Sequence, residues 1–277
     1  MRFMNKSNPI GVFDSGIGGL TVVKQLKQFL PNENIVYFGD TARVPYGTKS
    51  NATVIEYALE DAQFLINKNV KIIVVACNTA SSVALDVLRE KFGVPIIGMI
   101  NPGAKMALEK TQNKRIGVIG TEATISNAAY SKELYKLDGK IKIFEKACPL
   151  FVPLAEEGWL EHPATKLIAE EYLAELRQHE IDTLILGCTH YPLLKNLIQE
   201  VVGKDVTLID SGIAAAVVVK DYLAANNLLN DSAAEGNDLF YVSDMPAKFK
   251  LIAERFLGKK IPNLQKIDLH EELRKIG

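Results

Sequence analysis

The chain of 277 residues contains only three cysteines, and no two of them form a CxxC pair. An odd, unpaired set of cysteines does not build a disulfide framework, so we expect a reducing cytoplasm as the location. The sequence also lacks an apolar run long enough to cross a membrane. Its first residues, MRFMNKSNPIG, lack the apolar core of a signal peptide.

An excess of charge and the common cofactor motifs are also missing. The 32 Lys and Arg residues oppose 33 Asp and Glu residues, and this balance argues against a nucleic-acid or membrane partner. The glycine-rich stretch GIGGLT has Thr21 where the dinucleotide fingerprint requires glycine, and no Walker A motif is present. Cys188-x-His190 is the one paired spacing of metal ligands. We therefore expect no cofactor and no metal.

Short runs rich in valine and isoleucine alternate with helical segments along the chain. A clear amphipathic helix spans 54–66, where the apolar residues recur at helical spacing. This alternation predicts βαβ units, and hence an α/β fold in which helices cover parallel sheets. The predicted strands lie at 9–14, 34–39, 71–76, 94–99, 115–120, 140–145, 182–187 and 205–210. The segment 210–277 adds a predicted helix near 213–226 and a predicted strand at 239–242.

An internal repeat runs through these strands. Three features recur in the same order: IGVFDSG from Ile10 as IGVIGTE from Ile116, Val44-Pro45 as Val152-Pro153, and Cys77 as Cys188. The offset grows from 106 to 108 to 111, as small loop insertions would make it grow. We interpret residues 8–98 and 99–209 as two copies of one unit. The alternative is that α/β chains resemble one another at this level of detail.

Cys77 and Cys188 each follow a predicted strand and precede a helical segment. Ligands of open α/β sheets bind beyond the carboxyl ends of the strands. A helix N-terminus lowers the pKa of a thiol and attracts carboxylates, so we expect reactive thiols facing an acidic ligand. Two opposed thiols could form a disulfide, bind zinc or transfer protons. Proton transfer on the two faces of one carbon fits best, although cysteine after an apolar strand can also be plain core.

Polar residues follow two further strands. Asp14 and Ser15 end the first strand, where Asp14 could also cap a helix. Asp40, Tyr46 and Gly47 lie in the loop after the second strand, where contacts with a ligand are expected.

Taken together, five motifs resemble the cofactor-independent aspartate/glutamate racemase superfamily, and within it the glutamate racemases. They are DSGIGGLTV, GDTARVPYG, ACNTA, CPLFVPLAE and GCTHYPLL, which run in order from Asp14 to Leu194. The resemblance implies two similar doubly wound parallel-sheet α/β domains related by a pseudo-two-fold, with the active site in the cleft between them. The first domain would comprise 1–98 plus 210–277, and the second 99–209.

The resemblance also assigns roles. It implies Cys77 and Cys188 as the paired acid and base, assisted by Asp14, Glu156 and His190. It implies that the substrate is held by Asp14, Ser15, Tyr46, Gly47, Asn78, Thr79, Thr189 and His190, and we add Asp40 and Thr121 as predicted polar contacts. The expected substrate is glutamate, the expected product D-glutamate for peptidoglycan synthesis, and the expected assembly a homodimer.

For three residues near these motifs, the role is either left open or expected to be structural. The motif favours Glu156 as the assisting carboxylate, but the adjacent Glu157 could compete. Cys148 precedes a proline and is expected to be buried structure. Trp159 receives no assignment beyond partial burial or a subunit contact.

Overall fold

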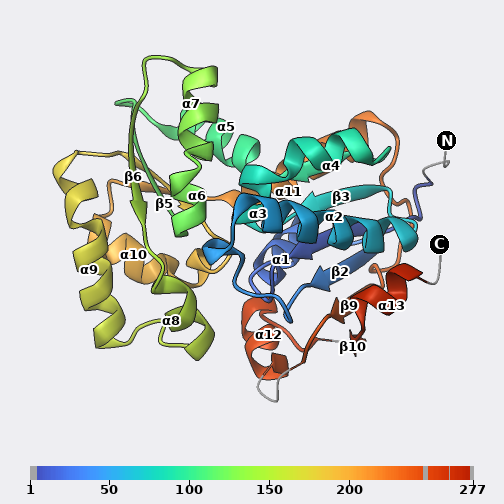
Figure 1. Ribbon diagram of the computed structural model, residues 1–277. Coiled ribbons are helices and arrows are strands. Elements are labelled where there is room, and N and C mark those ends of the chain that lie inside the picture. The colour runs from blue at the N-terminus through green and yellow to red at the C-terminus, as the bar shows by residue number, and fades with distance from the viewer. Residues whose placement is uncertain (1–4, 246–248, 262, 275–277) are drawn as a thin grey trace.

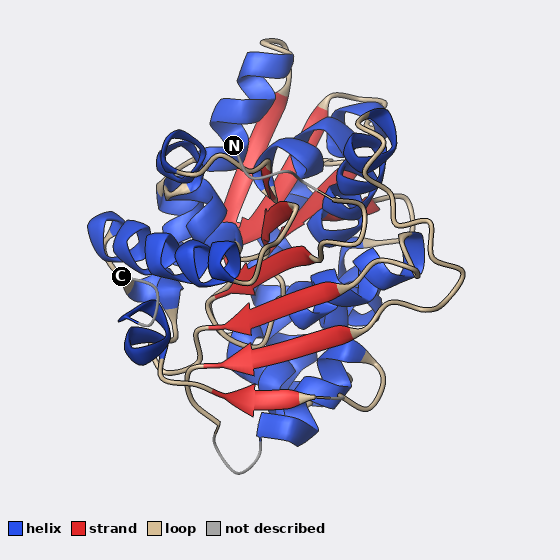
Figure 2. Ribbon diagram, turned by 90° about the vertical axis from the view of Figure 1, so that its right-hand side faces the viewer, coloured by secondary structure: helices blue, strands red, loops and turns tan. Residues whose placement is uncertain are grey.

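The computed structural model describes residues 5–245, 249–261 and 263–274, and within them the strands form two parallel sheets. The first sheet has the order β10-β9-β2-β1-β3-β4, and Figure 2 shows neighbouring arrows pointing the same way. Its strands are β1 (Ile10–Asp14), β2 (Ile35–Gly39), β3 (Ile72–Val75), β4 (Ile96–Gly98), β9 (Asp238–Val242) and β10 (Leu264–Lys266). The second sheet has the order β6-β5-β7-β8. Its strands are β5 (Arg115–Gly120), β6 (Lys142–Ala147), β7 (Thr183–Gly187) and β8 (Thr207–Asp210).

The two sheets repeat one strand order. The order β2-β1-β3-β4 of the first sheet recurs as β6-β5-β7-β8 in the second, strand for strand. This agreement supports the interpretation of the sequence repeat as two copies of one α/β unit. Each predicted strand forms within a few residues of its expected position, and β9 forms at the position predicted for it. The three-residue β10 was not predicted, because LQK carries no apolar run.

Helices connect the strands and cover the sheets (Figure 1). The α-helices before β6 are α1 (Leu20–Phe29), α2 (Asn51–Asn67), α3 (Asn78–Val83), α4 (Leu85–Lys91), α5 (Ile100–Lys110), α6 (Glu122–Ser126) and α7 (Ala129–Leu137). Those after it are α8 (Phe151–Glu157), α9 (Pro163–Gln178), α10 (Lys195–Val202), α11 (Ser211–Ala225), α12 (Phe249–Leu257) and α13 (Leu269–Arg274). Two 3₁₀ turns, η1 (Tyr46–Thr48) and η2 (Tyr191–Leu194), follow β2 and β7. The predicted helix at 54–66 lies within α2, and the one near 213–226 coincides with α11.

Alternating side chains of each strand enter different apolar cores. In β1, Ile10 and Val12 pack with α1, α11 and α12, whereas Phe13 packs on the opposite face with α2 and α13. The core on the α1 side continues into the second sheet, where Leu184 and Leu186 of β7 join it. A separate core lies between the other face of the second sheet and helices α5 and α7. The two sheets therefore share one continuous apolar core.

Several helices begin directly at the carboxyl end of a strand, at a residue that caps them. The carboxylate of Asp210 accepts hydrogen bonds from the first turn of α11, and the hydroxyl of Thr121 accepts one from Thr124 N at the start of α6. The Sγ atom of Cys77 accepts one from Ala80 N in α3. These caps satisfy N–H groups that a helix leaves unpaired, and they fix side chains at the ends of the strands.

Strands β9 and β10 of the C-terminal segment join the first sheet. A buried ion pair holds the chain segment that leads to β9. The ammonium of Lys71 lies 2.6 Å from the Glu33 carboxylate and donates to the Leu228 carbonyl. The other Glu33 oxygen accepts a hydrogen bond from Asn230 N.

Division of the chain into domains at 98/99 and 209/210 stays a prediction. In the described part of the chain, no helix combines the length and apolar character that a membrane crossing requires.

Breaking the Lys71–Glu33 pair should destabilise the protein. Both side chains are buried, so Lys71→Met leaves a buried carboxylate without its counter-ion, and we expect a loss of about 3–5 kcal/mol in the free energy of unfolding. Urea denaturation measures this loss, and the double variant Lys71→Met/Glu33→Leu should recover part of it. Lys114→Met breaks the solvent-exposed pair with Asp138 and should leave the unfolding midpoint nearly unchanged. Equal losses for Lys71→Met and Lys114→Met would contradict the anchoring role.

Candidate functional site

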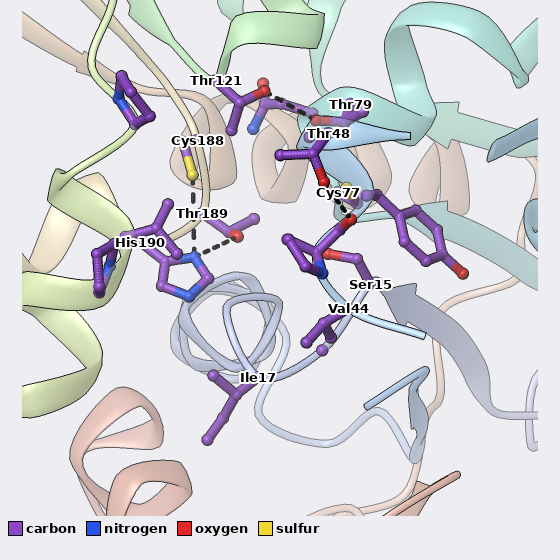
Figure 3. A pocket seen from close by; sticks show the side chains of 18 of the residues that line it. Ser15, Ile17, Val44, Thr48, Cys77, Thr79, Thr121, Cys188, Thr189 and His190 are labelled. Atoms are coloured by element: carbon purple, nitrogen blue, oxygen red, sulfur yellow. Dashed lines mark hydrogen bonds between the residues drawn. The ribbon is translucent and has the colours of Figure 1, made fainter. Parts of the chain in front are cut away.

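A cavity of about 390 Å³ lies where the carboxyl ends of strands from both sheets meet. The segments 15–17, 44–48 and 77–79 line it from the first sheet. Residues 121–122, 149, 152–153, 156 and 188–190 line it from the second. Figure 3 shows Cys77 and Cys188 on different sides of this cavity.

The pairing register places the two cysteines at equivalent positions. The first isoleucine of β1 pairs with Ile72, which lies five positions before Cys77. The matching isoleucine of β5 pairs with Thr183, which lies five positions before Cys188. The sequence recurrence of the cysteines is therefore a structural equivalence, and both cysteines line the cavity.

The same count relates further cavity residues, of which Val44, Thr48 and Val152 were not assigned to the site from the sequence. Ile10 of β1 pairs with Ile35 of β2, and Val44 lies nine positions after Ile35. Ile116 of β5 pairs with Ile143 of β6, and Val152 lies nine positions after Ile143. Thr48 and Glu156 correspond in the same way, thirteen positions on. All four line the cavity, as do the prolines that follow the two valines. The Val-Pro recurrence was visible in the sequence, so the repeat was the signal that could have found them.

Cys188 faces an imidazole. Nδ1 of His190 lies 3.8 Å from the Cys188 sulfur, and Nε2 lies 2.9 Å from Oε1 of Glu156. Burial alone would lower the pKa of His190, but the hydrogen bonds to Cys188 and Glu156, together with their negative charges, raise it to about 10. A protonated imidazole beside Cys188 attracts negative charge onto the sulfur.

Close packing holds this imidazole in place. The ring of Phe256 in α12 meets the His190 ring edge-on at 5.0 Å. A β-carbon at Gly18 would lie 2.6 Å from Nδ1 of His190, so only glycine permits this approach of the loop before α1. The imidazole is thus enclosed by segments from both halves of the chain.

Glu156, and not Glu157, reaches the site. Glu156 lines the cavity and binds His190, whereas Glu157 is exposed. Arg255 of α12 donates a hydrogen bond of 2.9 Å to the main-chain carbonyl of Glu156. Gly158 ends α8 with a φ of +77°, and a β-carbon there would lie 2.4 Å from the Arg255 guanidinium. Glycine at this position therefore serves both the turn and the arginine.

Cys77 lies in a different electrostatic setting. Burial raises the pKa of its thiol to about 12, and the negative charge of Asp14 adds to the increase. The expectation that a helix N-terminus lowers this pKa is wrong for Cys77, because burial and Asp14 outweigh the hydrogen bond from Ala80 N. The expectation of a helix directly after Cys188 also needs correction, since the turn that follows begins at Tyr191 and is a 3₁₀ helix.

Asp14 lies behind the wall of the cavity and does not line it. Its Oδ2 accepts a hydrogen bond from Gly16 N, and Oδ1 is buried with no hydrogen-bond partner among the described residues. Burial raises the pKa of Asp14 above its usual value, and His190 opposes the increase. The N-cap residue of α1 is Gly19, and no side chain among the described residues caps this helix. The alternative prediction that Asp14 caps a helix is therefore wrong for α1.

Polar side chains complete the cavity wall. The hydroxyls of Thr79 and Thr121 are 2.9 Å apart and connect the two halves of the chain. The main-chain carbonyl of Thr189 accepts a hydrogen bond from Thr21 of α1. The predicted site residues that the structure brings to the cavity are Ser15, Tyr46, Gly47, Cys77, Asn78, Thr79, Thr121, Glu156, Cys188, Thr189 and His190.

Asp40 does not reach the cavity and instead supports Tyr46 from behind. The Tyr46 hydroxyl donates to Oδ2 of Asp40 at 2.6 Å, and Arg43 forms ion pairs with Asp40 and Asp61. Burial, followed by the charge of Asp40, raises the pKa of Asp61 well above its usual value. This buried network holds the loop that carries Tyr46 and Gly47.

Cys148 and Trp159 lie outside the cavity lining. Cys148 is fully buried, in agreement with a structural role, and Trp159 is 45% exposed and stacks on His162. Among residues 5–245, 249–261 and 263–274, no three His, Cys, Asp or Glu side chains are grouped as a metal site would require.

The chain is similar to known racemases over nearly its whole length. A sequence profile of the Asp/Glu/Hydantoin racemase family matches residues 10–219. The glutamate racemase of Chlorobaculum tepidum is 50% identical, and the match covers 96% of this chain and 98% of that protein. The crystal structure of the Francisella tularensis glutamate racemase in complex with D-glutamate superposes with a TM-score of 0.90 at 42% identity, covering 96% of this chain and 99% of that one. Picrophilus torridus aspartate racemase, 19% identical, covers 80% of this chain and 99% of that one with a TM-score of 0.57, which indicates the fold alone.

Replacing Glu156 should change the titration of His190. The Glu156 carboxylate stabilises the imidazolium, so Glu156→Gln should lower the pKa of His190 from about 10 toward its usual value near 6.5. NMR titration of the imidazole measures the change directly. Glu157→Gln is the matched control and should leave the titration unchanged. An equal response to both variants would show that Glu156 has no special contact with His190.

Proposed function

The chain belongs to the Asp/Glu/Hydantoin racemase family, and on this premise we propose that it interconverts L- and D-glutamate by proton transfer between two cysteines. The observation that carries the proposal is the equivalence of Cys77 and Cys188 at the ends of β3 and β7, on different sides of one cavity. Racemisation requires removal of a proton from one face of a carbon and delivery of a proton to the other.

The cavity suits a small amino acid with two carboxylates. Its volume of about 390 Å³ holds glutamate with room for water. Hydroxyls of Ser15, Thr79 and Thr121 and the amide of Asn78 supply neutral hydrogen-bond donors along its wall. Such donors bind carboxylates without the long side chain of an arginine.

The two thiols differ in a way that fits the roles of base and acid. The imidazole of His190 lies beside Cys188, whereas burial and Asp14 raise the pKa of Cys77 to about 12 and so keep its proton in place. We therefore assign Cys77 as the acid in the free protein and, as the partner on the other side of the cavity, Cys188 as the base. As the family resemblance implies, this form accepts L-glutamate: Cys188 removes the α-proton, and Cys77 protonates the opposite face.

The step leaves Cys188 as a thiol and Cys77 as a thiolate, which is the form that racemises D-glutamate. The charge of the intermediate carbanion spreads into the α-carboxylate, so donors that face the carboxylate stabilise it. Thr79, Thr121 and Asn78 are the donors we assign to this task. No metal or organic cofactor takes part in this scheme.

In the cell, we propose that the product D-glutamate enters peptidoglycan synthesis. This role implies a cytoplasmic enzyme, since the small precursors of the cell wall are made there. We further propose a homodimer as the assembly.

The deciding experiment is racemisation by the purified protein with no added cofactor. We expect L-glutamate to lose its circular-dichroism signal, and the activity to survive dialysis against a chelator and treatment with hydroxylamine. Restoration of a lost activity by metal or pyridoxal phosphate would overturn the cofactor-free scheme. L-Aspartate is the comparison substrate, because preferential turnover of aspartate would favour another amino-acid racemase. Turnover of neither would indicate a module that only binds a small acid.

Replacing either cysteine by serine should abolish racemisation, since a serine hydroxyl is far less acidic than a thiol. We expect kcat to fall by roughly 10²–10⁴-fold for Cys77→Ser and for Cys188→Ser. Cys148→Ser is the matched control, because this thiol lies outside the cavity.

Deuterium incorporation tests the division of labour between the thiols. In deuterated water, deuterium should enter mainly the product enantiomer at early times, because the opposite thiol has exchanged with solvent. Mass spectrometry of the separated enantiomers provides the measurement. Equal early deuteration of substrate and product would indicate one base serving both faces.

A further inference from the structure

Tyr130 is a fully buried tyrosine of α7 that none of the motifs includes. Its ring lies between two glycines, Gly103 of α5 and Gly187 at the end of β7. A β-carbon at either glycine would lie 3.1 Å from the ring, which is tighter than most contacts of that kind. The ring therefore fills a slot that is open only because both neighbours are glycine.

The hydroxyl of Tyr130 reaches from the second half of the chain into the first. It donates a hydrogen bond of 2.7 Å to Oδ1 of Asn78, the first residue of α3. Asn78 follows Cys77 directly and lines the cavity. Tyr130 thus bonds to a cavity residue without lining the cavity itself.

Two hydrogen bonds define the orientation of the Asn78 amide. Oδ1 accepts the hydrogen bond from Tyr130, and Nδ2 lies 3.5 Å from the hydroxyl oxygen of Ser211. The amide nitrogen carries two hydrogens, and Ser211 takes at most one of them. In the described part of the chain no hydrogen-bond partner is found for the second N–H, and Asn78 lines the cavity.

We propose that Tyr130 is a positioning residue that holds the Asn78 amide with its N–H directed at a carboxylate of the substrate. If the amide turned over, its carbonyl oxygen would face the cavity and repel a carboxylate. Tyr130 opposes that turn, because its hydroxyl would lose the Oδ1 acceptor and would have to accept from the amide nitrogen while donating to its other partner, Ser211. The inference rests on the proposed function for the identity of the substrate.

The variant Tyr130→Phe removes the hydroxyl and keeps the ring in its slot. We expect kcat/KM for glutamate and the affinity for glutamate to fall about three- to tenfold, as loss of one neutral hydrogen bond would produce. L- and D-glutamate have equal free energies, so kcat/KM must fall by the same factor in both directions. The melting temperature should show that the variant is folded.

A double-mutant cycle separates positioning from general loosening of the core. If Tyr130 acts through Asn78, Tyr130→Phe should have no further effect in an Asn78→Ala background. A control cycle with Thr189→Val, a cavity residue that Tyr130 does not contact, should be additive. Each cycle is measured on kcat/KM and, by calorimetry, on the dissociation constant of glutamate.

The outcomes separate clearly. Additive effects of Tyr130→Phe and Asn78→Ala would overturn the inference, and so would equal non-additivity in both cycles. A wild-type protein that binds glutamate without racemising it would refute the proposed function, while the cycle on the dissociation constant would still test Tyr130. Failure of the wild type to bind glutamate would refute both.

Discussion

Parallel pairing of β1 with β3, and of β5 with β7, determines where the side chains of the cavity lie. Each pairing runs in the same register from the first isoleucine of the central strand, so the chain leaves both neighbouring strands at the same height. Because parallel strands end at one edge, the segments after them converge, and a cysteine five positions along reaches the cavity from each sheet. The caps of α3 and α6 and the close approach of Gly18 to His190 fix these segments further.

One backbone frame holds two chemically different half-sites. Equivalent positions are counted from the residues that pair with the first isoleucine of β1 or of β5. By this count Thr79 corresponds to His190, and Thr48 corresponds to Glu156. The half that contains Cys188 therefore has an imidazole and a carboxylate at positions where the other half has hydroxyls. Asp14, in turn, lies near Cys77 and disfavours its negative charge. Similar positions therefore place the two thiols beside different charged groups: His190 lies beside Cys188, and Asp14 lies near Cys77.

Local patterns were enough to predict the strands, the parallel fold and the recurrence of the cysteines. These features depend on apolar periodicity and on the order of residues along the chain, both of which can be read from sequence neighbours. The sequence could not reveal that burial dominates the pKa of Cys77, since burial depends on segments far along the chain. Nor could it show that Asp40 stands behind Tyr46, or that Tyr130 reaches Asn78 across the two halves. The strand β10 escaped because three largely polar residues form a strand only beside β9.

The apolar core that both sheets share affects whether either half of the chain could fold by itself. Leu20 and Val22 of α1 and Ala215 of α11 belong to the same core as Leu184 and Tyr191 from the second copy. A copy expressed by itself would leave part of this core in water, at a cost of about 25 cal/mol for each Å² of apolar surface. Because both halves contribute to this core, we expect the chain to unfold as one cooperative unit.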